Sequence, residues 1–413
     1  LDNIIVSGMA MDDSSGTPGV FQPIRLDHPA GHIAKFNSQG SRKWATYFGA
    51  ANYDYYFTIK SAIDKANEVV VTGKTTTTTT VFVTSGTYQS SLPYNPPHRN
   101  GYIAKLDTSG ALIWGTFVAS NDDIHTENIT IDKNNEIIIA GYTDAMTLIG
   151  TPGVFMQNTI AQYIDDVGFI MKFSSTGQRL WGSYYGSTTI YGQMQREVPP
   201  KAIKADSSGN IYMVGETDVS YYNNLDTLGT TGVFQTGYGG GNTDGYIVKF
   251  NPNGTRAWAS YYGGSSNDEI FGLAITDKNE AVIVGASKST NNISSPNAFN
   301  TNKSGQEDGF IAKFNSTGQR IYGSYYGGTG SEQCKAVCID SYGEIISLMN
   351  STSTSYQTNS NSFQANSLSN GTYMTTHISK LSDCTLPDIP NLIASDTLVC
   401  PNEQTTISLS GQL

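Results

Sequence analysis

The stretch GFIAKFNSTGQRIYGSYYGG, residues 309–328, contains two runs rich in β-branched and aromatic residues on either side of a polar turn. Such residues are enriched in β-strands, and a turn of three to five residues that contains glycine commonly joins two antiparallel strands. Gly318 supplies that glycine. The stretch therefore predicts a β-hairpin.

The first phrase of this stretch recurs along the chain. It reads GHIAKF from residue 31, GYIAKL from 101, GFIMKF from 168, GYIVKF from 245, GFIAKF from 309 and, degenerately, THISKL from 376. Its lysines are Lys35, Lys105, Lys172, Lys249, Lys313 and Lys380, at intervals of 70, 67, 77, 64 and 67 residues. This period exceeds that of the common helical repeats.

Each unit adds two further strands around a second short turn. Examples are AIDKANEVVVTG at 62–73 and TIDKNNEIIIAG at 130–141, in which a strand ends at Asp and a β-branched strand ends at Gly. One four-stranded sheet cannot cover both of its faces, but radial stacking buries each face against the next sheet. The repeat predicts an all-β fold, a β-propeller of four-stranded blades over residues 1–383.

The ends of the repeat are incomplete, and its loops vary. The opening unit lacks its first strand and the last unit lacks its fourth, so we expect flanking sequence to close the ring. The longest variable loops span 74–100 and 217–244. A loop phrase recurs as TPGVFQ from residue 17, TSGTYQ from 84, TPGVFMQ from 151 and TTGVFQ from 230, and we expect its aromatic residue to anchor the loop on the blade.

Together these phrases resemble the SBBP family, the seven-bladed β-propeller repeat of secreted bacterial surface proteins. The family unit has the order DGFIAKF, GxxxWxxYYGG, IxxDxxGNxYVxG and TPGxFQ. The resemblance covers residues 1 to about 383, and the sixth unit differs most because it lacks the Trp/Tyr strand. It implies that the six visible copies belong to an intact ring of seven blades, and it identifies an architecture and not an activity.

The tail after Leu381 has a different pattern. Two prolines, Pro387 and Pro390, mark a linker, and residues 384–413 look like a linker and the start of an Ig-like module. Cys384 and Cys400 bracket this linker, and in an exported protein we expect them to form a disulfide, although two free thiols are the alternative. Cys334 and Cys338 lie too far apart along a strand to bond, and we expect small core residues there.

Composition limits the partners. The formal net charge is -11 and the pI is about 4.9, so a nucleic acid or an anionic membrane is disfavoured as a partner. No apolar run is long enough to insert into a membrane, and the N-terminus lacks the pattern of a signal peptide. We expect the export signal to lie outside this chain.

The repeated lysines lie inside predicted strands, where an unpaired ammonium group is costly, so we predict structural ion pairs. Their most plausible partners are the periodic aspartates, although these carboxylates could instead cap their own turns. Both interpretations remain open. The aspartates are Asp64, Asp132, Asp206, Asp277 and Asp340.

A second acidic position recurs eight to ten residues before each of those aspartates. By symmetry these carboxylates would gather near one channel mouth, where they could bind Ca²⁺ or accept backbone hydrogen bonds. The chain has no DxDxDG-type loop, which favours the hydrogen-bonding interpretation. The residues are Asp54, Asp123, Glu197, Asp268 and Glu332.

The arginines and histidines do not form a convincing active site. Arg42, Arg179, Arg256 and Arg320 occupy equivalent hairpin positions, which favours a structural role. A sialidase needs three convergent arginines, and the non-periodic set of Arg25, Arg99 and Arg196 is unconvincing. The five histidines show no spacing typical of a metal site.

The sequence thus predicts a non-catalytic scaffold of a large secreted or cell-surface protein, for adhesion or partner binding. By resemblance, we expect type IX secretion, a link to gliding motility, and secretion or surface-anchoring machinery, glycans or other surface proteins as partners. A carbohydrate-binding propeller is the first alternative, because Tyr-rich units offer stacking faces. A carbohydrate-active enzyme is the second, with candidate loops at 88–100 and 221–244.

Overall fold

The computed structural model describes residues 3–11, 15–26, 30–49, 59–76, 81–92, 98–159, 163–164, 166–186, 194–195, 199–218, 228–353, 375–381 and 405–408. Within these ranges every regular element is a β-strand, and the sheets form a six-bladed β-propeller arrangement. The predicted all-β propeller is therefore confirmed. Among the described residues, no helix is long and apolar enough to cross a bilayer.

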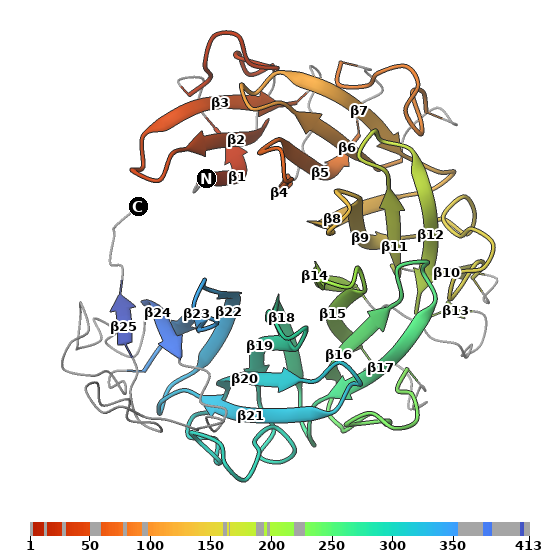
Figure 1. Cartoon of the computed structure of the whole chain (residues 1–413). Coiled ribbons are helices and arrows are strands. Elements are labelled where there is room, and N and C mark those ends of the chain that lie inside the picture. The colour runs from red at the N-terminus through yellow and green to blue at the C-terminus, as the bar shows by residue number, and fades with distance from the viewer. Residues whose placement is uncertain are drawn as a thin grey trace, which may run out of the picture. The chain divides into compact units, whose positions relative to one another are not determined.

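The six sheets follow the repeat (Figure 1), and five of them have four strands. The first sheet contains β1 (Ile4–Ala10), β2 (Ala30–Phe36) and β3 (Arg42–Phe48). The second contains β4 (Lys60–Ile63), β5 (Val69–Thr75), β6 (Asn100–Leu106) and β7 (Leu112–Val118). The third contains β8 (Ile124–Ile131), β9 (Ile137–Thr143), β11 (Val167–Phe173) and β12 (Arg179–Tyr185).

The remaining sheets keep the same order of strands. The fourth contains β14 (Pro200–Ala205), β15 (Ile211–Asp218), β16 (Thr243–Phe250) and β17 (Arg256–Tyr262). The fifth contains β18 (Asp268–Ile275), β19 (Ala281–Ser287), β20 (Asp308–Phe314) and β21 (Arg320–Tyr326). The sixth contains β22 (Glu332–Ile339), β23 (Ile345–Ser351), β24 (Thr375–Leu381) and β25 (Thr405–Ser408). Two short strands, β10 (Tyr163–Ile164) and β13 (Met194–Gln195), pair in parallel.

The hairpin at residues 308–326 forms as the sequence predicts. β20 and β21 pair antiparallel, and the Asn315 side chain accepts the backbone N–H groups of Thr317 and Gln319, each at 3.0 Å. Gly318 has a φ of 83°, which a residue with a side chain adopts only with strain. The glycine therefore fixes the turn.

The chain divides into two compact units. The first comprises Leu1–Ile211 with Phe250–Ala257, and the second comprises Tyr212–Lys249 with Trp258–Leu413. Within the first unit, β8 packs on β4, β5 and β6 of the preceding sheet. Within the second unit, β22 packs in the same way on β18, β19 and β20. In both units an innermost strand covers the face of the sheet before it.

Apolar clusters fill the space between successive sheets. Phe48 of the first sheet and Tyr102 of the second share one cluster, while Met349 of the sixth sheet packs with Val284 and Ile311 of the fifth. Every residue of β19 and β20 is buried. Since neither face of this blade meets water, these strands are buried throughout and mostly apolar, without the alternation of a half-exposed strand.

The two ends of the repeat differ from each other. The first sheet has three strands, as predicted. The expectation that the last unit lacks its fourth strand is wrong, because β25 pairs antiparallel with β24 from His377 to Lys380. Cys384 and Cys400 lie outside the described residues, and the Ig-like module and the seventh blade remain predictions.

Candidate functional site

Four of the six repeated lysines bind a carboxylate in the inner turn of their own sheet. Lys105 Nζ lies 2.8 Å from Asp64 Oδ2 and 2.7 Å from Glu68 Oε2. Lys172 Nζ lies 2.7 Å from Asp132 Oδ2 and 2.6 Å from Glu136 Oε2. In these two blades the buried ammonium group is held between two carboxylates.

The same aspartates also cap their turns. Asp64 Oδ1 accepts the N–H groups of Ala66 at 2.8 Å and Glu68 at 2.9 Å, while Oδ2 faces Lys105. Burial acts to raise the pKa of Asp64, but the hydrogen bonds from Lys105 and from these amides outweigh it, and the pKa falls below its usual value. The two interpretations of the periodic aspartates thus hold at one residue, with one oxygen for each role.

The other blades vary this arrangement. Lys313 pairs with Glu280 at 2.7 Å, and Lys380 pairs with Asp340 at 2.8 Å. The assignment of Asp277 to the periodic position is wrong, because the Thr276 hydroxyl caps the turn by accepting the Glu280 N–H at 3.1 Å. Lys35 and Lys249 donate to backbone carbonyls, those of Asn67 at 2.9 Å and Ser316 at 3.3 Å.

Glutamates form a partner set that the sequence interpretation missed. Each lies four residues after the turn-capping residue and binds the lysine of the same sheet. This fixed spacing is the signal that could have found them. The set is Glu68, Glu136, Glu280 and Glu344.

The periodic arginines cover the aromatic residue of the loop phrase. The guanidinium carbon lies 4.7 Å from the ring centroid of Tyr88 for Arg179, and 4.2 Å from that of Phe234 for Arg320. Arg256 covers Phe155 at 4.2 Å. These cation–π contacts fasten loops to hairpins, so three of the four periodic arginines have structural contacts. Arg42 is exposed at the start of β3.

The non-periodic arginines do not share one setting. Arg25 is buried, whereas Arg99 lies with its guanidinium 3.5 Å from Asp123 Oδ2. Arg196 lies outside the described residues. The arginine set that a sialidase would need therefore has two described members in different surroundings.

The end of the 88–100 loop builds a polar cluster at the start of β8. His98 Nδ1 lies 3.4 Å from Asp122 Oδ1 and 3.6 Å from Asp123 Oδ1. Asp123 Oδ1 also accepts the Arg99 N–H at 2.7 Å, and its Oδ2 lies 3.7 Å from His125 Nε2. We call these five residues the rim cluster. Two of its members, His98 and Arg99, lie in one of the two loops that the sequence marks as candidates for an asymmetric site.

The electrostatics of the rim cluster argue against a strong cation site. His98, Asp122 and Asp123 could together contact a metal ion. However, the Arg99 guanidinium already neutralises Asp123, and burial lowers the pKa of His125 to about 4, so that its imidazole is neutral. His125 stacks on Tyr142 with ring centroids 4.4 Å apart. The cluster is equipped to hydrogen-bond an uncharged polar group.

The second acidic position separates into different environments. Asp54 and Glu197 lie outside the described residues. Asp268 and Glu332 occupy the same place, since they pair with Ser287 and Ser351 just before the same bulge. Ile124 takes this place in the third sheet, because it pairs with Thr143. The grouping of Asp123 with Asp268 and Glu332 is therefore wrong by one residue.

The double glycines before these acids make room for carboxylates. Gly328 N–H donates to Glu332 Oε2 at 2.8 Å, and a Cβ on Gly327 would lie 2.5 Å from the same oxygen. Gly264 N–H donates equivalently to Asp268 Oδ2 at 2.7 Å. None of these glycines has a positive φ among those recorded for the described residues. These glycines are therefore needed for the close approach of a carboxylate and not for a positive φ.

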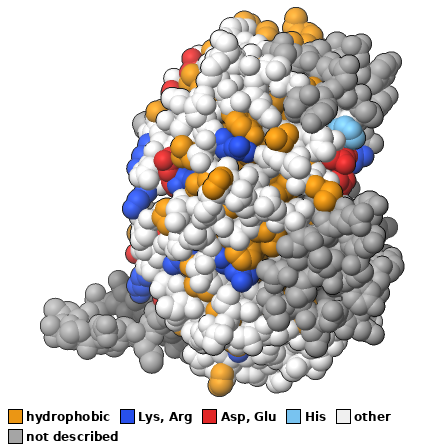
Figure 2. All heavy atoms as spheres, turned by 90° about the vertical axis from the view of Figure 1, so that its right-hand side faces the viewer, with side chains coloured by type: hydrophobic (Ala, Val, Ile, Leu, Met, Phe, Trp, Pro, Cys, Tyr) orange, Lys and Arg blue, Asp and Glu red, His pale blue; other side chains and the backbone are white. Residues whose placement is uncertain are grey.

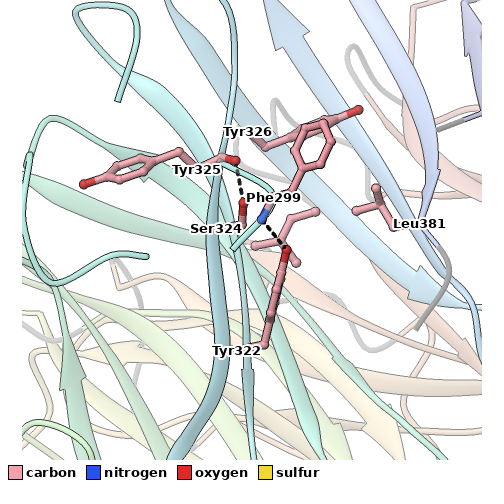
Figure 3. Close-up of a pocket in the computed structure, with 7 residues that line it drawn as sticks. Phe299, Tyr322, Ser324, Tyr325, Tyr326 and Leu381 are labelled. Carbon is pink, nitrogen blue, oxygen red and sulfur yellow. Dashed lines mark hydrogen bonds between the residues drawn. The ribbon is translucent and has the colours of Figure 1, made fainter. Parts of the chain in front are cut away.

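A small aromatic pocket lies between the fifth and sixth sheets (Figure 3). Its cavity volume is about 30 Å³, and it is lined by Phe299, Ile311, Tyr322, Ser324, Tyr325, Tyr326 and Leu381. The Tyr322 hydroxyl accepts the Phe299 N–H at 3.2 Å. In the blade before, Phe234 at the corresponding place donates its N–H to Gly318 of the next hairpin turn at 2.9 Å. The pocket lies at the contact between blades where the outer strand has Tyr322 in place of the Trp of the earlier blades.

Hydrophobic and charged side chains are scattered over the exposed surface and do not form a large patch on the face shown in Figure 2. On the face shown in Figure 2, hydrophobic and basic side chains are spread among neutral ones, and a histidine lies beside acidic and basic groups. Exposed aliphatic residues recur at one position in three of the outer strands, at Ile113, Leu180 and Ile321. Single exposed apolar residues of this kind are ordinary on a protein surface and define no site.

The fold and these contacts define a β-propeller whose repeated polar residues join its blades. No family model matches the chain. It is 24% identical over 257 residues to an uncharacterised WD repeat-containing protein of Acanthamoeba polyphaga mimivirus, a match that covers 56% of this chain and 18% of that protein. The chain therefore spans less than a fifth of this distant relative.

Solved structures show likeness at the level of the fold. A protein of unknown function from Dyadobacter fermentans is 11% identical over 79% of each chain, with a TM-score of 0.38. A polysaccharide lyase described as an ulvan lyase is 8% identical over 91% of this chain and 82% of its own, with a TM-score of 0.43. An intramolecular trans-sialidase from Ruminococcus gnavus is 10% identical over 85% and 87%, with a TM-score of 0.42.

Proposed function

We propose that this chain is a non-catalytic propeller scaffold within a larger secreted or cell-surface protein, and that its variable loops bind a partner or a surface. The observation that supports this most is that the periodic charged residues make contacts that stabilise the blades. Lys105, Lys172 and Lys313 lie in ion pairs within sheets, and Arg256 and Arg320 lie on loop aromatics. Such contacts stabilise blades and leave the recurring residues without a catalytic role.

The proposed location outside the cell follows from the resemblance of the repeated phrases to the SBBP family. On the same ground we propose export by type IX secretion, with surface-anchoring machinery as a partner and a link to adhesion or gliding. Detection of the chain on intact cells, and its retention inside cells that lack a type IX apparatus, would test this. Accumulation inside otherwise normal cells would contradict it.

The scaffold proposal is tested by separating binding from stability. We expect the purified protein to release no product from a panel of polysaccharides. In an adhesion assay, replacement of the solvent-facing residues of the 88–92 loop should lower surface binding while the melting temperature changes little. Turnover of any polysaccharide that saturates with substrate would overturn the scaffold assignment.

Carbohydrate binding is a second candidate, because the rim cluster offers donors and acceptors next to an aromatic pair. His98 and Asp122 are partly exposed, and His125 is stacked on Tyr142. Sugar hydroxyls are recognised by such groups. On a glycan array we expect saturable binding that His98→Ala and Asp122→Ala weaken, with Asp107→Ala in a distant turn as the control. Equal binding by all variants would exclude this site.

A further inference from the structure

Two fully buried carboxylates face each other between neighbouring sheets of the second unit. Asp244 is in β16 and Asp268 is in β18 (Figure 1), and neither is exposed to solvent. A Cβ on Gly263 would lie 2.1 Å from Asp244 Oδ1 and 3.0 Å from Asp268 Oδ2. Both side chains therefore converge on the same glycine.

One oxygen of each carboxylate has a partner and the other does not. Asp244 Oδ2 accepts the Gly239 N–H at 2.5 Å, and Asp268 Oδ2 accepts the Gly264 N–H and the Ser289 hydroxyl, each at 2.7 Å. Asp244 Oδ1 is buried without a hydrogen-bond partner among the described residues, and Asp268 Oδ1 has none within hydrogen-bond distance. Burial raises the pKa of Asp268, although the nearby Ser287 hydroxyl acts to lower it. A buried carboxylate oxygen without a partner is costly unless a ligand neutralises it, and here the unpaired Asp244 Oδ1 lies on the same glycine as Asp268 Oδ2.

Main-chain oxygens lie on the other side of the Asp244 carboxyl, around Gly239. The position that a Cβ on Gly239 would take lies 2.5 Å from Gly264 O, 3.0 Å from Gly263 O and 3.1 Å from Asp244 Oδ2. Main-chain carbonyls and carboxylates are the ligands that hard divalent cations prefer, whereas softer metals select imidazole or thiolate. The lack of a side chain on Gly239 and Gly263 keeps this oxygen-lined cradle open.

The next blade contact supplies a contrast. Asp308 and Glu332 are placed in the same way, yet Asp308 accepts the N–H groups of Ser304 at 2.8 Å and Gly305 at 2.7 Å. Glu332 Oε1 accepts the hydroxyls of Ser351 and Ser353, both at 2.8 Å. With each oxygen satisfied by the protein itself, this pair needs no ligand.

We propose that Asp244 and Asp268, with the carbonyl oxygens of Gly263 and Gly264, bind a divalent cation of the Ca²⁺ class. The cation would allow both buried carboxyl groups to be ionised at neutral pH. Burial, and then the charge of Asp268, raise the pKa of Asp244 to about 8 when no cation is bound. The site is distinct from the adhesive function proposed above and holds two adjacent blades together.

Thermal unfolding with and without Ca²⁺ tests the proposal. Because a ligand that binds only the folded state stabilises it, millimolar Ca²⁺ added to the EGTA-treated protein should raise the melting temperature by about 2–4 °C or more. Asp244→Asn and Asp268→Asn should abolish this rise. Their melting temperatures in EGTA should match or exceed that of the wild type, since each substitution replaces a buried carboxyl group by a neutral amide that cannot ionise, and this also shows that they fold.

Control variants test whether the ion binds at this pair of carboxylates and not elsewhere. Asp308→Asn changes the satisfied pair and His98→Ala changes the rim cluster, and both should keep the full Ca²⁺ response. Tb³⁺ luminescence excited through nearby tyrosines should appear in the wild type and be lost in the Asp244→Asn and Asp268→Asn double variant. The proposal is overturned if Ca²⁺ leaves the wild type unchanged, or if the double variant keeps the shift.

Discussion

At the scale of single residues, Lys172 shows how a charge is kept inside stacked sheets. Its side chain is 3% exposed and that of Asp132 is fully buried, while Glu136 completes the triad from a partly exposed position. Burial acts to lower the pKa of Lys172, but its hydrogen bonds to both carboxylates raise it above the usual value. The ammonium group therefore stays charged. The stability of the fold here depends on having both the positive lysine and the negative carboxylates.

Removal of the lysine alone should be costly. Lys172→Met leaves the Asp132 carboxylate buried without its cation, which should lower the free energy of unfolding by about 3–5 kcal/mol. Urea denaturation at neutral pH measures this. The Lys172→Met and Asp132→Asn double variant should recover much of the loss, because asparagine can still cap the turn. Lys380→Met, at the solvent-exposed equivalent, should have little effect.

His125 should make stability depend on pH. Its pKa falls from the usual 6.5 to about 4, because burial and the charges of Lys74 and Arg99 outweigh Asp123 and Glu127. The unfolded imidazole therefore takes up a proton below pH 6.5 while the folded one does not. Stability should be full above pH 6.5 and fall by about 1–2 kcal/mol towards pH 4, after allowance for solvent screening.

The matched variant for this effect is His125→Phe, which keeps an aromatic ring on Tyr142 and cannot titrate. Carboxylates and His377 titrate in both proteins, so the difference between the two urea-denaturation curves isolates His125. We expect the variant to have the shallower dependence between pH 6.5 and 4. Parallel curves would show that the imidazole is charged in the folded state.

The sequence predicts which residues recur, but it places some of them wrongly by one residue. The second strands of the second, third and fifth sheets contain a repeated glycine, at Gly73, Gly141 and Gly285. The turn-capping residue lies nine residues before it, at Asp64, Asp132 and Thr276. A further eight residues back from the cap lie Ile124 and Asp268. An interval of eight to ten residues between acidic residues points to Asp277 and Asp123 instead. The structural equivalence follows the exact number of residues between positions, and not the presence of a carboxylate.

At the scale of elements, tryptophan and glycine join successive sheets. Trp114 of β7 donates its indole N–H to Ser175 O at 3.1 Å in the next hairpin turn. Gly177 of that turn has a φ of 81° and lies directly under the ring, since a Cβ there would be 2.9 Å from Trp114 Cε3. The Tyr88 N–H also donates to Gly177 O at 3.0 Å. The sequence shows the recurrence of Trp and Gly, but their contact is visible only in three dimensions.

Gly177→Ala should therefore destabilise the protein for two reasons. The positive φ disfavours alanine by roughly 1–2 kcal/mol, and overlap with the Trp114 ring adds about 1–3 kcal/mol. Gly153 has a φ of 82° and open space around it, so Gly153→Ala carries the first cost alone. The difference in unfolding free energy between the two variants measures the ring contact. Equal losses would mean that the ring moves aside without cost.

At the scale of the whole molecule, stability should differ among the sheets of one unit. In the second unit, β19 and β20 are buried throughout. The sixth sheet is less covered, because buried and partly exposed residues alternate along β23. The tryptophan contact is also altered there, since Tyr322 stands in β21 where the earlier outer strands have Trp. Repeat arrays open first where the contacts between neighbours are weakest.

Hydrogen exchange should therefore show faster exchange in β23 than in β19, although each is the second strand of its sheet and is paired on both sides. The comparison is internal, because both peptides come from one unit and one sample. Tyr322→Trp is the matched variant, since it restores the residue type of the earlier outer strands at the pocket lined by Phe299 and Leu381. Slower exchange in β23 with unchanged β19 would support local opening, whereas equal protection in the wild type would show that the unit opens only as a whole.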